Sequence, residues 1–163
     1  MHSTMGAEMV ALLPRLRRYA LALCRSSALA DDLVQGACLR ALSHAEMWEE
    51  GTRFDAWMFR ILRNYWIDTT RRDQRWKSIE AGDADTEAVG DSGEAVLMGR
   101  LMIRDVSRAI ASLPDEQREV LLLVCVEDLA YREAAEVLGV PVGTVMSRLA
   151  RARRRVVELM RAA

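Results

Sequence analysis

Residues 131–155, the most informative segment of the chain, read YREAAEVLGVPVGTVMSRLARARRR. A short helical pattern ends at the turn Gly139-Val140-Pro141, and a long basic helix follows it. Ala135 is small enough for the second helix to cross closely, Gly139 permits a left-handed turn, and Val145 fills the gap between the helices. This spacing predicts a helix-turn-helix, whose second helix enters the major groove of DNA, with a plain helical hairpin as the alternative.

The second helix of this motif separates apolar from basic positions. At about 100° per residue from Thr144, the positions between about 80° and 140° form an apolar stripe of Val145, Leu149, Ala152 and Val156. A second face spans roughly 300° to 40° and consists of Thr144, Ser147, Arg148, Arg151 and Arg155. For any one arginine, exposure to solvent without a DNA contact is the alternative. However, no acidic residue lies on this face between Thr144 and Arg155. Such arginines can pair with guanine in the major groove and neutralise phosphates.

Charge is segregated along the chain, although the net charge is only −1. Residues 60–77 carry six basic and two acidic side chains, and residues 141–161 carry six arginines against one glutamate. Between them, residues 78–99 carry six acidic side chains and no basic one. Two basic segments therefore flank an acidic spacer, which favours a nucleic acid as the partner.

Helical periodicity also describes the N-terminal half of the chain. Residues 8–43 read as two helices with a break at Ser26-Ser27, residues 44–53 as a loop, and residues 54–72 as a third helix. Helicity resumes near Val96 and breaks at Leu113-Pro114.

The segment between these two helical parts, residues 77–96, is acidic and rich in Gly, Ala and Ser, which is typical of a flexible linker. A tether that lets two DNA-binding units reach separated sites is one interpretation, and a solvated segment without function is the other. We therefore expect an all-α fold of two small helical domains, residues 1–76 and 97–163, joined by a flexible acidic linker.

The sequence predicts no enzyme, metal site or cofactor. Glycine-rich phosphate loops, G-x-S-x-G and H-E-x-x-H are absent, and the three cysteines and two histidines lie too far apart for a metal-binding motif. Each cysteine is expected to be a small buried apolar residue. Because no apolar run reaches 18 residues and the N-terminus lacks the pattern of a signal peptide, we expect a cytoplasmic protein without membrane insertion.

Four quoted segments resemble a known family. LPDEQREVLLL, residues 113–123, and the motif at 131–155 are similar to region 4 of sigma-70 family factors of the extracytoplasmic-function (ECF) group. DDLVQGACLRAL, residues 31–42, and FDAWMFRILRNYWIDTTRR, residues 54–72, resemble region 2 of the same factors. The resemblance implies a subunit of bacterial RNA polymerase that directs promoter-specific transcription initiation.

In that family region 2 docks on the clamp helices of the polymerase beta-prime subunit and melts the −10 element, while region 4 binds the beta flap and reads the −35 element. The resemblance implies a polymerase-docking set of Asp31, Asp32, Gln35, Leu39 and Arg40. It implies −35 readers among Arg132, Thr144, Ser147, Arg148, Arg151 and Arg155. It also implies control by an anti-sigma protein, because the chain carries no further regulatory domain.

For the −10 element, the resemblance assigns the loop from Trp48 to Arg53 to a flipped base and Asn64 to the lining of its pocket. The implied −10 set is Trp48, Gly51, Arg53, Arg60, Arg63, Asn64, Trp66, Arg71 and Arg72. Extruded bases stack on aromatic faces, at roughly 1–3 kcal/mol per base, while cationic side chains follow the backbone. Tyr65, Trp66 and Trp76 could supply those faces, with packing in the core as the alternative for the first two.

Three positions depart from the family pattern, and one of them is Trp66, which is bulkier than the family pattern leads us to expect. Gly36 replaces the usual glutamate, which should cost the helix about 1 kcal/mol relative to alanine and removes a possible polar contact to polymerase. Ala130 replaces a serine that would cap the next helix, so half of a capping box with Glu133 is missing.

Two other functions remain open from the residues alone. One is a helix-turn-helix transcriptional regulator that acts independently of core polymerase, and the other is a protein that sequesters part of the sigma machinery. The DDLVQ helix argues against the first and the arginine face against the second.

Overall fold

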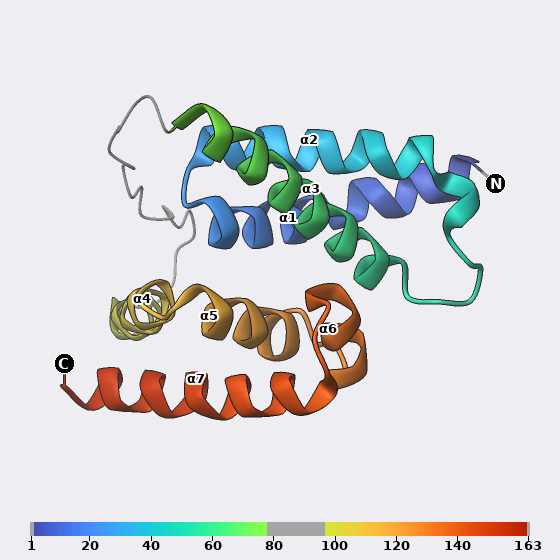
Figure 1. The fold of residues 1–163 in the computed structure, drawn as a ribbon. Helices are drawn as coiled ribbons and strands as arrows, with labels where there is room; N and C mark the ends of the chain where they lie inside the picture. The colour runs from blue at the N-terminus through green and yellow to red at the C-terminus, as the bar shows by residue number, and fades with distance from the viewer. Residues whose placement is uncertain (1, 78–96, 163) are drawn as a thin grey trace. The chain divides into compact units, whose positions relative to one another are not determined.

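The computed structural model describes residues 2–77 and 97–162, and every regular element within these ranges is helical (Figure 1). The elements are α1 (His2–Cys24), α2 (Ser27–Ser43), the 3₁₀ turn η1 (Ala45–Met47), α3 (Phe54–Lys77), α4 (Leu97–Ala111), α5 (Asp115–Leu121), the π-helical segment η2 (Leu122–Val126), α6 (Tyr131–Leu138) and α7 (Val142–Ala162). The all-α prediction is confirmed. The predicted linker, apart from Lys77, lies outside the described residues.

The chain divides into two compact units. The first contains α1, α2, η1 and α3, and the second contains α4, α5, η2, α7 and the start of α6. Among the described residues, no helix is long and apolar enough to cross a membrane.

The first unit is a bundle in which α1, α2 and α3 contact one another in all three pairs. Its core is formed by side chains that are almost fully buried: Leu16, Tyr19, Ala20, Ala30, Leu33, Ala37, Met58, Phe59 and Leu62. The Tyr19 and Phe59 rings meet edge to face, with their centroids 5.5 Å apart. The predicted break between the first two helices is confirmed, because Ser26 caps α2 by accepting a hydrogen bond from the Leu29 N–H at 3.4 Å.

Gly36 on α2 lies directly against the Tyr65 ring of α3. A Cβ atom at this position would lie 2.4 Å from Cε1 and Cζ of Tyr65, so the tyrosine ring occupies the space of the missing side chain. The same ring lies 4.8 Å from the Arg40 guanidinium, which also pairs with Asp68 at 3.0 Å. The glycine is thus a packing requirement of this chain, because a glutamate here would displace Tyr65.

Replacing Gly36 with glutamate should force the Tyr65 ring from its site at a cost of about 1–3 kcal/mol. Because glutamate recovers at most about 1 kcal/mol of helix propensity, the free energy of unfolding of the first unit should still fall. In a Tyr65→Ala background the same substitution should cost less, so the two changes should couple in a double-mutant cycle. Denaturation followed by tryptophan fluorescence measures this unit alone, since all four tryptophans lie within residues 48–76. Additive energies would contradict the packing account.

The second unit is built around contacts of α7 with α4 and α5. Leu113, Val120, Leu123, Val145 and Leu149 are almost fully buried in it. Arg118, also buried, ties the turn between α4 and α5 by donating to the Leu113 carbonyl at 2.9 Å and pairing with Asp115. A polar side chain therefore holds the turn that presents α5 to α7.

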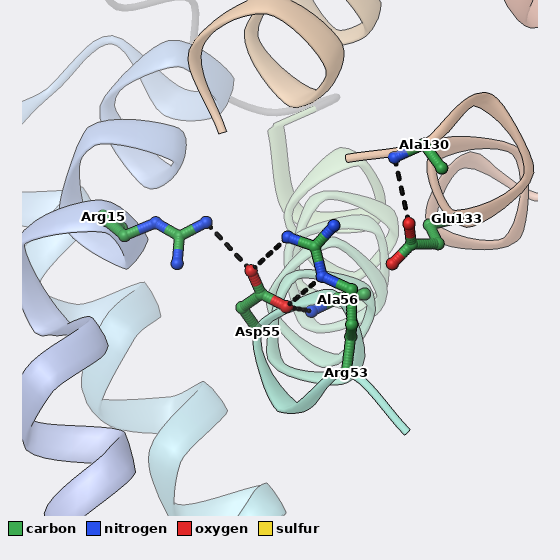
Figure 2. A network of polar contacts seen from close by, with 6 residues as sticks. All are labelled: Arg15, Arg53, Asp55, Ala56, Ala130 and Glu133. Carbon is green, nitrogen blue, oxygen red and sulfur yellow. Dashed lines mark hydrogen bonds and ion pairs between the residues drawn. The ribbon is translucent and has the colours of Figure 1, made fainter. Parts of the chain in front are cut away.

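The helix-turn-helix forms as predicted. Gly139, between α6 and α7, has a φ of +65°, the left-handed conformation that glycine adopts without strain. At the start of α6, the Glu133 carboxylate accepts a hydrogen bond from the Ala130 N–H at 3.0 Å (Figure 2). That half of the capping box is present even though the Ala130 side chain cannot supply the other half.

Candidate nucleic-acid interface

The apolar stripe and the basic face predicted for α7 occupy different environments. Val145, Leu149 and Ala152 are buried and Val156 is half-buried, so the stripe forms the contact with the rest of the unit. On the basic face Ser147, Arg151 and Arg155 are exposed, whereas Thr144 and Arg148 are half-buried. Arg132, on α6, is exposed as well. The face therefore presents hydroxyl and guanidinium groups, which are able to hydrogen-bond to base edges and phosphates.

Arg148 differs from the other arginines of this face because it has an acidic partner on α5. Its Nη2 atom lies 3.5 Å from Oε1 of Glu116, and its side chain is only 20% exposed. The sequence did not point to Glu116, since 32 positions separate it from Arg148.

A shallow hollow of about 210 Å³ lies beside the basic face, between the start of α5 and α7. It is lined by Pro114, Gln117, Arg151, Arg154, Arg155 and Glu158. Arg154 was not among the predicted DNA-binding residues, although its place at about 280° on the helix, next to Ser147, would have suggested it. Three guanidinium groups around one hollow suit a phosphate of the DNA backbone.

On α3 the structure brings together some of the predicted −10 residues and separates another. Arg60, Asn64 and Arg71 are exposed and lie within about 40° of one another on the face opposite Leu62. Arg72 is exposed further round the helix, and Arg63 is half-buried.

Trp66 does not join this face. It points about 160° away from Asn64, toward the side of α3 that carries Leu62, and it is half-buried. Tyr65 is half-buried against Gly36 and Arg40. Packing in the core therefore describes Tyr65 and Trp66 better than stacking on bases does. The side chain of Trp76 lies outside the described residues.

The loop before α3 is tied to the helix by aromatic contacts. The Trp48 ring meets Phe54 edge to face at 5.3 Å, and Phe54 in turn lies 5.8 Å from Trp57. Gly51 is exposed with a φ of +90°, which favours glycine at the tip of the loop. Trp48 therefore anchors the loop, while Gly51 leaves its tip open.

Asp55, in the first turn of α3, joins this loop to α1. Figure 2 shows Arg15 and Arg53 converging on its carboxylate, with Arg15 Nη2 at 3.0 Å and Arg53 Nη2 at 2.7 Å from Oδ2. The Ala56 N–H donates to Oδ1 at 2.8 Å. Burial alone would raise the pKa of Asp55, but these hydrogen bonds outweigh burial and lower it.

Asp55→Asn should lower the free energy of unfolding of the first unit by about 1–3 kcal/mol at neutral pH, because two guanidinium groups lose their charged acceptor. Because the pKa of Asp55 is lower in the folded state, its ionised carboxylate stabilises the fold fully at pH values above the unfolded-state pKa of about 4. This stabilisation is lost as the pH falls through the lowered pKa of the folded state. The difference between wild type and variant should therefore shrink below about pH 4 in fluorescence-detected denaturation.

Asp68→Asn is the matched control, because Asp68 pairs with Arg40 at a side chain that is 47% exposed. At neutral pH it should cost less than about 1 kcal/mol. Equal costs for the two variants, or a cost for Asp55→Asn that does not change with pH, would contradict this assignment.

The predicted docking residues on α2 divide into two groups. Asp31, Asp32, Gln35 and Leu39 are exposed within about 100° of the helix surface, and Leu42 lies among them with 48% of its side chain exposed. Asp31 pairs with Arg17 of α1 at 3.0 Å. Around the helix axis, Arg40 lies about 100° or more from Asp31, Gln35 and Leu39. It is turned toward α3, where it contacts Tyr65 and Asp68. The structure thus places an acidic and apolar face on α2 without Arg40.

The expectation that all three cysteines are buried is wrong for Cys125. Its side chain is exposed at the end of η2, where the Arg153 Nη2 lies 3.8 Å from its Sγ. Cys24 and Cys38 are half-buried, and burial raises the pKa of both thiols.

Comparison with known proteins gives these surfaces a context. Residues 9–77 match the family model for sigma-70 region 2, and residues 103–156 match the model for sigma-70, region 4. The ECF RNA polymerase sigma factor EcfG of Rhodopseudomonas palustris strain TIE-1 is 36% identical over 94% of this chain and 83% of its own length. The chain belongs to the ECF group of sigma-70 family factors.

Further comparisons agree with this assignment. The ECF sigma factor SigW of Bacillus subtilis strain 168 is 30% identical over 76% of the chain and 71% of its own length. The solved structure of RpoE from Bartonella quintana, in complex with the anti-sigma factor NepR, is 30% identical, covers 96% of both chains and has a TM-score of 0.82. CnrH in complex with the cytosolic domain of CnrY shares the fold, with a TM-score of 0.69 at 24% identity. The match to region 2 argues against a regulator that acts without polymerase.

Proposed function

We propose that this ECF sigma factor works as two domains, residues 1–76 and 97–163, on a tether at 77–96. The first domain docks on the beta-prime clamp helices of core polymerase and reads and melts the −10 element. The second binds the beta flap and reads the −35 element. The observation that carries the proposal is the exposed acidic and apolar face of α2, found in a chain that also has basic faces on α3 and α7.

In the first domain, the face formed by Arg60, Asn64 and Arg71 meets the melted strand. The guanidinium groups follow the phosphates, and the Asn64 amide pairs with an extruded base. The loop anchored by Trp48 closes over that base, and Arg53 is held beside it by Asp55. Trp66 contributes by packing rather than by stacking on DNA.

In the second domain, Ser147, Arg148 and Arg151 read base edges from α7, while Arg132, Thr144 and Arg155 add contacts to the same DNA. The hollow bounded by Arg151, Arg154 and Arg155 takes a flanking phosphate. Because phosphate contacts dominate affinity and are sequence-independent, the specificity of this domain depends on the few side chains that reach the bases.

Control by a separate anti-sigma protein completes the proposal. The related RpoE was solved in complex with NepR, and its likeness to this chain extends over both regions. A protein of that kind, added in equimolar amount, should prevent association with core polymerase by covering the docking surfaces. Because core polymerase and promoter DNA are cytoplasmic, the protein would act in the cytoplasm as well.

Promoter binding with and without core polymerase tests this function. The free protein should bind promoter and unrelated fragments with similar, strongly salt-dependent affinity, and core polymerase should add sequence preference. Tight, sequence-specific binding by the free protein would instead support a regulator that acts independently of polymerase.

A further inference from the structure

Glu116 and Arg148 connect α5 to the DNA-reading face of α7. The Arg148 side chain is 20% exposed, whereas the Glu116 side chain is 70% exposed, so the carboxylate reaches out from α5 and the guanidinium lies against the unit. Thr144 is the other half-buried residue of the face, and the arginines at 151 and 155 are exposed. Arg148 is therefore held against the unit by a carboxylate of another helix, whereas the exposed Arg155 pairs at 3.5 Å with Glu158 of its own helix.

A guanidinium held by one carboxylate can still read a base. It carries five N–H donors in a planar fork, and the pair with Glu116 engages Nη2, which leaves further donors for the O6 and N7 acceptors of guanine. A free arginine loses much rotamer entropy when it binds, and this loss is smaller when the side chain is fixed before DNA arrives.

The carboxylate also affects DNA that offers no guanine at this point. Glu116 brings a negative charge to the edge of a face that otherwise attracts phosphates, so it weakens binding to any DNA in which Arg148 finds no base partner. The attractive contact to guanine and the repulsion of other DNA both increase the difference in affinity between the correct −35 sequence and other sequences.

We propose that Glu116 is a positioning residue for −35 recognition: it orients Arg148 toward a G·C base pair and opposes binding to non-cognate DNA. The proposal rests on the −35 reading proposed for α7. If the pair only stabilised the fold, removing the Glu116 charge would leave base preference unchanged.

The test measures how tightly holoenzyme, assembled from core polymerase and the full chain, binds promoters that differ at single −35 base pairs. Discrimination is the ratio of its affinities for two such promoters. Arg148→Ala first identifies the base pair that Arg148 reads, because discrimination there should disappear. Glu116→Gln should lower discrimination at that same base pair by roughly three- to tenfold and strengthen binding to unrelated DNA. In the Arg148→Ala background, Glu116→Gln should not change base preference further.

Glu136→Gln is the matched control, because it removes the same charge from an exposed position on α6. It should leave the preference at the Arg148 base pair unchanged. The proposal is overturned if Glu116→Gln keeps wild-type discrimination where Arg148→Ala loses it, or if Glu136→Gln has the same effect as Glu116→Gln. If Arg148→Ala alters no base preference, the reading role of Arg148 fails along with this proposal, whereas initiation by the wild-type holoenzyme tests the sigma function independently.

Discussion

Leu39→Glu should weaken binding to core polymerase by about thirtyfold or more, the loss typical of an interface hot spot. Leu39 is 66% exposed on α2, beside Gln35 and Asp32 and close to the exposed Leu42. An apolar side chain this exposed gains most when a partner covers it, and a glutamate in its place would carry a charge into that contact. Titration of labelled protein with core polymerase measures the dissociation constant.

Leu29→Glu is the control for this prediction. Leu29 is 48% exposed on the same helix but lies about 80° from Leu39 and about 60° from Asp32, beyond the edge of the docking face. It stands three residues after the cap Ser26, where a glutamate suits the helix start. Affinity for core should therefore stay close to wild type in this variant. Similar losses in both variants would mean that added charge on α2, rather than this face, weakens docking.

Phe59→Ala should destabilise the first unit by about 3–5 kcal/mol, the usual cost of truncating a buried phenylalanine. The Phe59 side chain is fully buried, its ring meets Tyr19 edge to face, and the Arg15 guanidinium lies 5.4 Å from its centroid. Because marginally stable domains have little stability to spare, much of this unit should then be unfolded at 37 °C. Denaturation followed by tryptophan fluorescence reports the change in this unit.

Ile61→Ala, two residues along α3, provides the comparison. Ile61 is half-buried, so its truncation should cost clearly less than that of Phe59. Circular dichroism of the Phe59→Ala protein should still show helix from the second unit, which has its own core. A loss below about 1.5 kcal/mol for Phe59→Ala would mean that the Tyr19 and Phe59 contact does not organise the bundle.

The sequence predicts the helical elements well because their signals are local. Periodicity and the turn at Gly139 define the helix-turn-helix, and the stripe of Val145, Leu149 and Ala152 is buried as the angular pattern requires. The largest error in the boundaries is at the N-terminus, where α1 begins at His2 instead of residue 8.

Contacts between helices are what the sequence could not supply. Periodicity does not reveal which residue of α3 crosses α2 at Gly36, so the fit with Tyr65 and the inward turn of Arg40 emerge only in three dimensions. The pair of Glu116 and Arg148 is hidden for the same reason. Trp66 and Cys125 show the converse, because residue type alone suggested a DNA contact for the first and burial for the second.

Start-site-specific transcription in vitro is the decisive measurement of sigma activity. Purified bacterial core polymerase is supplied with a pool of promoter fragments, with and without this protein, and transcripts are mapped. Defined transcripts should appear only when the protein is present, and they should be lost with Arg148→Ala or Asn64→Ala. A core polymerase that neither binds the wild-type protein nor initiates with it, although both units are folded, would contradict the sigma function.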